Sequence, residues 1–130
     1  MIKKFYVGVK GIIKTDQGYL VLKHAKGHYD TPGGRIDGNE EFEQTLRREL
    51  SEELPGIADV SIGDLLSSSR LHIDIEDETS LVLLYFLVTA TLPDPLVLSE
   101  EHQSYQWITS VDAIPSDIKP DIDSILRKLL

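Results

Sequence analysis

One stretch of the chain, TPGGRIDGNEEFEQTLRRELSEEL at residues 31–54, restricts the fold most, because it joins a pair of glycines to an amphipathic helix. Asn39 is predicted as the N-cap, with Glu40 in the first turn, where the helix dipole favours negative charge. Pro55-Gly56 is expected to end the helix. The apolar stripe that should face the core recurs every four residues and consists of Phe42, Leu46, Leu50 and Leu54.

Three glutamates near the end of this helix, Glu49, Glu52 and Glu53, fall on one side of it. At about 100° per residue they span about 100° of arc, and Glu53 lies inside the edge of the apolar stripe. Half-buried carboxylates are unfavourable unless a cation balances them, and Arg48 alone does not balance all of them. A hard divalent cation would do so, because Mg²⁺ and Mn²⁺ prefer oxygen ligands. The alternative is a solvated acidic helix face with ordinary salt bridges.

The rest of the chain predicts a mixed sheet. Strands are expected at residues 5–13, 19–24, 58–75 and 80–91 and around Trp107. Residues 81–88 are apolar without alternation, so both faces of that strand should be covered. A C-terminal amphipathic helix is predicted from the spacing of Ile122, Ile125, Leu126 and Leu129. This order predicts one domain over residues 1–130, an α+β fold in which the sheet lies between helices.

Composition excludes several classes of partner and site. A formal net charge of −9 repels phosphate polyanions, so nucleic acid is not an expected partner. The absence of cysteine excludes disulfides and thiolate metal sites. The longest apolar run, residues 81–88, is far shorter than the ~20 residues that cross a bilayer, and the N-terminus does not resemble a signal peptide. A cytoplasmic protein without membrane contact is therefore expected. The histidines show no paired metal-binding spacing and are predicted to be surface or strand residues: His24, His28, His72 and His102.

One spaced pattern matches a known family. Gly34 is followed after five residues by Glu40, and after seven more by RELSEE at residues 48–53. This pattern resembles the signature box of the Nudix hydrolases, and the order of the flanking elements is similar to that family's αβα sandwich. The chain departs from the usual box at two places. Pro55 stands where the family has a glycine, and Asn39 stands where a glycine commonly precedes the first glutamate.

The resemblance implies that the protein hydrolyses a pyrophosphate bond in a nucleoside diphosphate derivative, with Mg²⁺ or Mn²⁺ as cofactor. Glu49 and Glu53 are then expected as direct metal ligands. Glu52 would complete the cluster directly or through water, and the carbonyl of Gly33 is a further expected ligand. A bound cation would also reverse the local field that a chain of this charge presents to phosphates.

The same resemblance suggests roles for residues around the metal ligands. Arg48 is expected to orient the carboxylates, while Gly34 and Glu40 shape the loop or hold a water. The general base is expected either on the box helix or at Glu101, with Glu100 as the alternative. A polar turn without a catalytic role is the other interpretation of that late segment.

The expected substrate is a nucleoside triphosphate or a modified one. A nucleotide sugar or dinucleoside polyphosphate is the alternative within the same chemistry, and a non-catalytic nucleotide-binding module is the alternative of another class. Arg35 is expected near the phosphates, and Tyr29 is the first candidate to stack on a base. The resemblance also allows a homodimer, because many family members are dimers.

Overall fold

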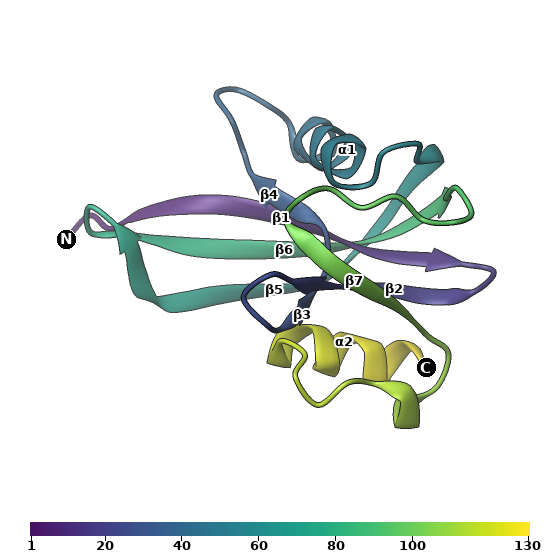
Figure 1. Ribbon diagram of the computed structural model, residues 1–130. Helices are drawn as coiled ribbons and strands as arrows, with labels where there is room; N and C mark the ends of the chain where they lie inside the picture. The colour runs from purple at the N-terminus through teal and green to yellow at the C-terminus, as the bar shows by residue number, and fades with distance from the viewer.

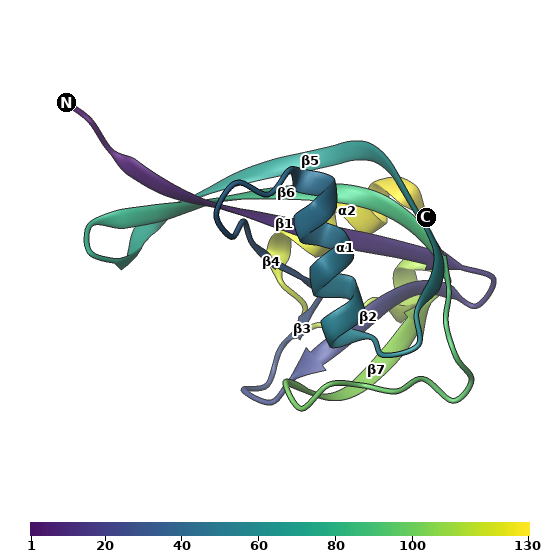
Figure 2. The same cartoon turned by 90° about the horizontal axis from the view of Figure 1, so that it is seen from above.

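A mixed sheet forms the middle layer of the structure, which is a computed structural model of residues 1–130. Helices α1 (Phe42–Glu53) and α2 (Pro120–Leu129) cover its opposite faces, as Figure 1 and the view from above in Figure 2 both show. The predicted α+β arrangement, with a sheet between helices, is thus confirmed. The strands are β1 (Lys4–Thr15), β2 (Gly18–His24), β3 (Tyr29–Asp30), β4 (Gly33–Arg35), β5 (Ala58–Glu76), β6 (Thr79–Thr91) and β7 (His102–Ile108).

The pairing of the strands divides the sheet into two branches. Strand β1 runs parallel to β6, and β5 pairs antiparallel with the other edge of β6. β1 and β2 pair only beside their connecting turn, where Lys14 faces Tyr19. Beyond the turn, β1 pairs with β4, whereas β2 pairs with β3 and β7. The branch that carries β4 and the branch that carries β7 are the two parts of the sheet that contribute to the site.

Strand β6 is apolar without alternation because helices cover both of its faces. Val88 packs with Leu46 and Leu50 of α1, whereas Tyr85 belongs to the cluster that includes Ile122 and Ile125 of α2. A strand buried on both faces needs apolar side chains in both directions, so the prediction for residues 81–88 is confirmed. Neither helix has the length and apolar character required to cross a lipid bilayer.

The start of α1 differs from the prediction. Its N-cap is Glu41 and not Asn39, so Glu40 lies before the first turn. Glu41 N–H donates to the side chain of Gln44 at 2.8 Å, and this reciprocal capping box outweighs the preference of asparagine for the cap position. The predicted core position of Phe42 is also wrong: its side chain, in the first turn, is 45% exposed.

The glycine pair forms part of a strand rather than the predicted loop. In β4, Gly33 pairs with Lys10 and Gly34 with Val9 of β1. Gly33 has a φ of +154°, and a Cβ there would lie 2.0 Å from the carbonyl oxygen of Val9. Only glycine allows the two backbones to approach this closely. Such a short strand contains too few residues to show an alternating pattern, which is why the sequence predicted a loop.

Candidate active site

The last turns of α1 carry the predicted glutamates at three different depths. Glu53 is 7% exposed, the side chain of Glu49 is 18% exposed, and that of Glu52 is 59% exposed. This gradient follows from the helical angles, since Glu53 lies nearest the apolar stripe and Glu52 farther round the helix. Buried and exposed carboxylates therefore stand side by side at the end of a single helix.

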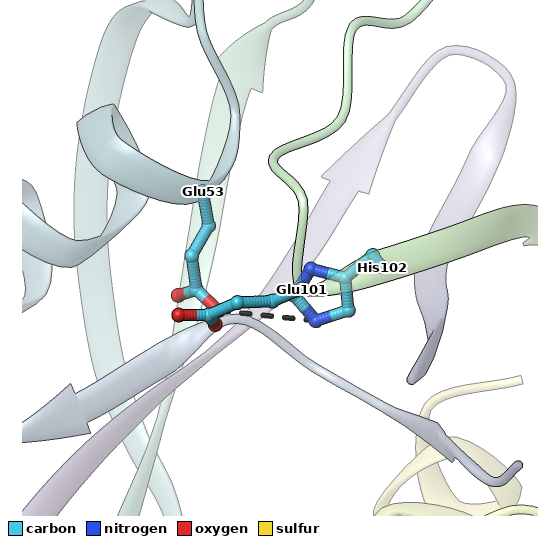
Figure 3. A group of neighbouring side chains, drawn as sticks. All are labelled: Glu53, Glu101 and His102. Atoms are coloured by element: carbon cyan, nitrogen blue, oxygen red, sulfur yellow. Dashed lines mark ion pairs between the residues drawn. The ribbon is translucent and has the colours of Figure 1, made fainter. Parts of the chain in front are cut away.

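The side chain of Glu53 is fixed from two directions. Its Oε2 accepts a hydrogen bond from the N–H of Gly33 at 2.8 Å. Its Oε1 lies 3.9 Å from Nε2 of His102 (Figure 3). The backbone carbonyl of Glu53 also accepts a hydrogen bond from Ser99 N–H at 3.3 Å. These contacts connect the end of α1 to β4 on one side and to the loop before β7 on the other.

A β-bulge near the start of β7 directly follows Glu101 and His102, the two residues that approach Glu53. The register between β2 and β7 shifts between Lys23 and His24, so β7 has an extra residue there. The ligand atoms of Glu53, Glu101 and His102 all lie within 4.8 Å of one another. Figure 3 shows the three side chains gathered at this point. The loop of residues 92–101 and the bulge together bring side chains from distant parts of the chain into one cluster.

Arg48 connects the acidic cluster to the loop before α1. Its guanidinium donates to both carboxylate oxygens of Glu40, at 2.8 and 2.9 Å, and to Glu49 at 2.9 Å. Glu52 lies farther away, at 3.7 Å from the same guanidinium. The hydrogen bonds from Arg48, together with the N–H of Asp37, lower the pKa of Glu40 to about 2. Arg48 therefore holds Glu40 and Glu49 in fixed positions relative to each other.

The cluster has the properties expected of a site for a hard cation. Burial raises the pKa of Glu53 to about 7, with the N–H of Gly33 and the charge of Lys10 opposing this rise and Glu49 and Glu101 adding to it. Burial also raises the pKa of Glu49, although Arg48 opposes the rise. Carboxylates with raised pKa values lack sufficient positive charge nearby, and oxygen donors in this number suit a divalent ion. The residues therefore fit the expected metal.

Each of the two glycines of the box contacts one glutamate of α1. At Gly34 a Cβ would lie 2.3 Å from Oε1 of Glu49, so the missing side chain leaves the space that this carboxylate occupies. Gly33 presents its N–H to Glu53. At the other end of the box, α1 ends at Glu53, and Gly56 takes a left-handed φ of +87°. The displaced glycine thus still allows the helix exit that Pro55-Gly56 predicted.

The two predicted substrate contacts have other partners in this structure. The guanidinium of Arg35 stacks on the ring of Tyr6 at 4.3 Å and lies 3.5 Å from Glu76. The ring of Tyr29 is buried in the core beside α2, and its hydroxyl accepts a hydrogen bond from Gln106 at 2.9 Å. Tyr29 is 7% exposed, and its role in stacking on a base stays a prediction.

Two features near Glu53 were not expected from the sequence. Lys10 Nζ lies 3.2 Å from Asp30 Oδ1, and Lys119 Nζ lies 3.1 Å from Oδ2 of the same carboxylate. Burial opposes the ionisation of Asp30, but the two lysines outweigh it and lower its pKa. The one indication of this ion pair in the sequence was a lysine within the apolar run VGVKGII. The second feature is His102, whose pKa burial lowers against the opposing charge of Glu101.

Comparison with known proteins assigns the family. A family model described as NUDIX domain matches residues 4–129. The chain is 30% identical over 112 residues to a bis(5'-nucleosyl)-tetraphosphatase (asymmetrical) of Caenorhabditis elegans, a match that covers 84% of this chain and 78% of the relative. It is 26% identical over 128 residues to the nucleoside triphosphatase NudI of Escherichia coli, covering 89% of this chain and 90% of the relative.

Solved structures have the same fold. A MutT NUDIX hydrolase from Burkholderia pseudomallei matches with a TM-score of 0.79 and 25% identity, over 98% of this chain and 100% of the other. A MutT protein from Methanosarcina mazei matches with a TM-score of 0.78 and 20% identity, over 98% of this chain and 94% of the other, and it supports the fold alone. On the family match over nearly the whole chain, the protein belongs to the Nudix hydrolase family, enzymes that cleave a pyrophosphate bond in nucleoside diphosphate derivatives.

Proposed function

We propose that this Nudix hydrolase acts on nucleoside triphosphates, including modified ones. The observation that carries the proposal is the gathering of Glu53 with Glu101, with Glu49 adding to the same electrostatic field, in a chain of net charge −9. Such a cluster is suited to a cation that a polyphosphate shares. The E. coli NudI proteins are named nucleoside triphosphatases, and one of them aligns over 90% of its own length, which supports this substrate class.

Mg²⁺ or Mn²⁺ is the proposed cofactor. Glu49 and Glu53 are its proposed ligands, with Glu52 and the carbonyl of Gly33 as further oxygen donors. The burial and raised pKa values of Glu49 and Glu53 support the first two assignments. When bound, the cation neutralises phosphate charge and makes the phosphorus easier to attack.

Two further roles are proposed: one residue positions a carboxylate, and another accepts a proton. Arg48 keeps Glu49 in place through its hydrogen bonds to Glu49 and Glu40. Glu101 is the proposed general base: its exposed carboxylate lies beside Glu53 and accepts the proton of the attacking water. The water oxygen then bonds to phosphorus, and the bridging P–O bond breaks with its electron pair going to the leaving phosphate. Glu100 is the weaker candidate because it is not part of the cluster around Glu53.

Dinucleoside polyphosphates are a second proposed substrate class. The relative at 30% identity is named a bis(5'-nucleosyl)-tetraphosphatase, and this observation favours the alternative. Both classes present a chain of phosphates to the carboxylates, and they differ in its length and in whether a second nucleoside is attached to its far end.

A substrate panel tests the proposal. The purified protein is incubated with nucleoside triphosphates, base-modified triphosphates, dinucleoside tetraphosphates and nucleotide sugars, with Mg²⁺ or with chelator, and the released phosphates are identified. Hydrolysis of triphosphates that requires the cation is expected. Faster cleavage of a dinucleoside tetraphosphate would favour the second class, and background rates on every triphosphate would refute the first.

A pair of neighbouring variants tests the general base. Glu101→Gln keeps the shape of the side chain and removes its basic oxygen, so kcat should fall by about 10²-fold or more. Glu100→Gln makes the same chemical change one residue away and should have a much smaller effect. The opposite order of effects would transfer the role to Glu100.

A further inference from the structure

His102 is a buried imidazole with an unsatisfied nitrogen. Its side chain is 4% exposed, and Nδ1 has no hydrogen-bond partner. The other nitrogen, Nε2, lies 3.9 Å from Oε1 of Glu53, which is beyond a hydrogen bond. Figure 3 shows the ring beside the carboxylates of Glu53 and Glu101. Buried polar groups nearly always have partners. A ligand at Nε2 would account for that nitrogen, whereas Nδ1 stays unpaired.

The arrangement of donor atoms fits a shared ion. Ligand bonds of about 2.0–2.2 Å place neighbouring donors about 3 Å apart and opposite donors about 4.3 Å apart. The 3.9 Å between His102 Nε2 and Glu53 Oε1 lies within that range. Oε2 of Glu53 is already occupied by the N–H of Gly33, so Oε1 is the oxygen left free, and it is the one nearest the imidazole. Glu101 supplies a third donor within 4.8 Å of the other two.

We propose that His102 is a nitrogen ligand, with Glu53 and one oxygen of Glu101, for a first-row transition ion such as Mn²⁺ or Co²⁺, while the other oxygen of Glu101 keeps its proposed role as general base. The inference rests on the metal-dependent function proposed above and adds a donor that the glutamates of the box do not supply. Imidazole binds first-row transition ions well, whereas Mg²⁺ favours sites made wholly of oxygen. His102 therefore shifts the preference of this position from Mg²⁺ towards transition ions.

Pulsed electron paramagnetic resonance of the Mn²⁺-loaded protein tests the proposal without an activity assay. The protein is prepared without a histidine tag, loaded with one equivalent of Mn²⁺, and examined for electron spin echo modulation from a directly bound imidazole nitrogen. The modulation should be present in the unmodified protein and should change its frequencies when the histidines are labelled with ¹⁵N. Mn²⁺ that binds without imidazole modulation, or fails to bind, would overturn the proposal.

Variants assign the modulation to a single residue. His102→Gln offers an amide in place of the ring, so the nitrogen modulation should disappear and the Kd for Mn²⁺ should rise by about 10-fold or more, with a smaller change for Mg²⁺. His72→Gln is the matched control, because His72 lies on the exposed β5–β6 hairpin and contacts Arg70. Modulation that persists in His102→Gln would refute the assignment.

A complementary variant covers the case in which His102→Gln does not fold. Replacing His24, His28 and His72 together by glutamine leaves His102 as the only histidine of the chain. Imidazole modulation should persist in this protein, and its loss would contradict the proposal. The result is separable from the substrate proposal: modulation without hydrolysis of any nucleotide refutes the proposed substrates alone, whereas hydrolysis without modulation refutes the role of His102 alone.

Discussion

Replacing Glu53 by glutamine should stabilise the metal-free protein while it removes activity. The amide keeps the length and shape of the side chain, and its oxygen can still accept the hydrogen bond from Gly33 N–H. It removes a negative charge from a position that is 7% exposed and that also experiences the charges of Glu49 and Glu101. Without a cation, that charge opposes folding, so its removal should favour the folded state.

The size of the effect depends on the shift of the pKa. Glu53 has a pKa of about 7 in the folded protein against an ordinary value of 4.5. At about 1.4 kcal/mol per unit, the difference corresponds to about 3 kcal/mol. Because folding raises the pKa of Glu53, its charge does not affect the stability of the wild type below pH 4.5. Stability then falls as the pH rises from 4.5 to about 7, and it falls no further at higher pH. The glutamine variant should therefore gain up to about 3 kcal/mol at pH 8 and less than about 1 kcal/mol at pH 5.

Urea denaturation with chelator at pH 5 and pH 8 measures this gain. Glu43→Gln is the matched control, since Glu43 lies on the same helix with an exposed side chain. With saturating Mg²⁺ the wild type should recover stability by ligand linkage and the variant should recover less. Turnover should fall by about 10²-fold or more in the variant. Equal or lower stability of the variant at pH 8 with chelator would refute the electrostatic reasoning.

Three other substitutions test separate parts of the site and core. Gly34→Ala should lower kcat by about 10-fold or more with little change in Tm, because its Cβ would displace the end of the Glu49 side chain and no backbone; an unchanged kcat would contradict this. Arg48→Lys should lower kcat by about 10-fold, since lysine cannot bind both oxygens of Glu40; a kcat equal to wild type would remove its positioning role. Leu50→Ala, at a fully buried position, should lower the free energy of unfolding by about 2–5 kcal/mol in urea denaturation; a smaller loss would show that the core adjusts.

Long segments were predictable from the sequence because many residues in each of them carry the same signal. Strands β1, β5 and β6 and helix α2 lie close to their predicted bounds for this reason. The start of α1 was not predictable in this way, because Asn39 and the pair Glu41 and Gln44 are competing caps two residues apart. The local pattern cannot decide which of them closes the first turn. Strands β3 and β4 are too short to carry a periodic signal at all.

The burial of Glu53 was predictable from the spacing of residues along α1, because the angular position of a residue on a helix is a local property. No local pattern in the sequence indicates that His102 approaches Glu53. This approach depends on β7 pairing with β2, on a bulge beside His24, and on the contact between Ser99 and the end of α1. These interactions join residues far apart in the chain, and spacing along the sequence does not encode their distance. Hence the spacing of the histidines does not indicate a cluster made of one histidine and two carboxylates.

Hydrogen bonds hold two of the clustered carboxylates in place. Gly33 N–H holds Glu53, and Arg48 holds Glu49, so neither side chain can relieve its repulsion by turning to solvent without losing a hydrogen bond. A chain with freely moving carboxylates would be more stable in the metal-free state but would have to order them when a cation binds. In this chain the hydrogen bonds to Glu53 and Glu49 form on folding and supply part of that ordering. Lower stability of the metal-free protein and strong binding of the proposed cation would therefore both follow from this fixed arrangement of carboxylates.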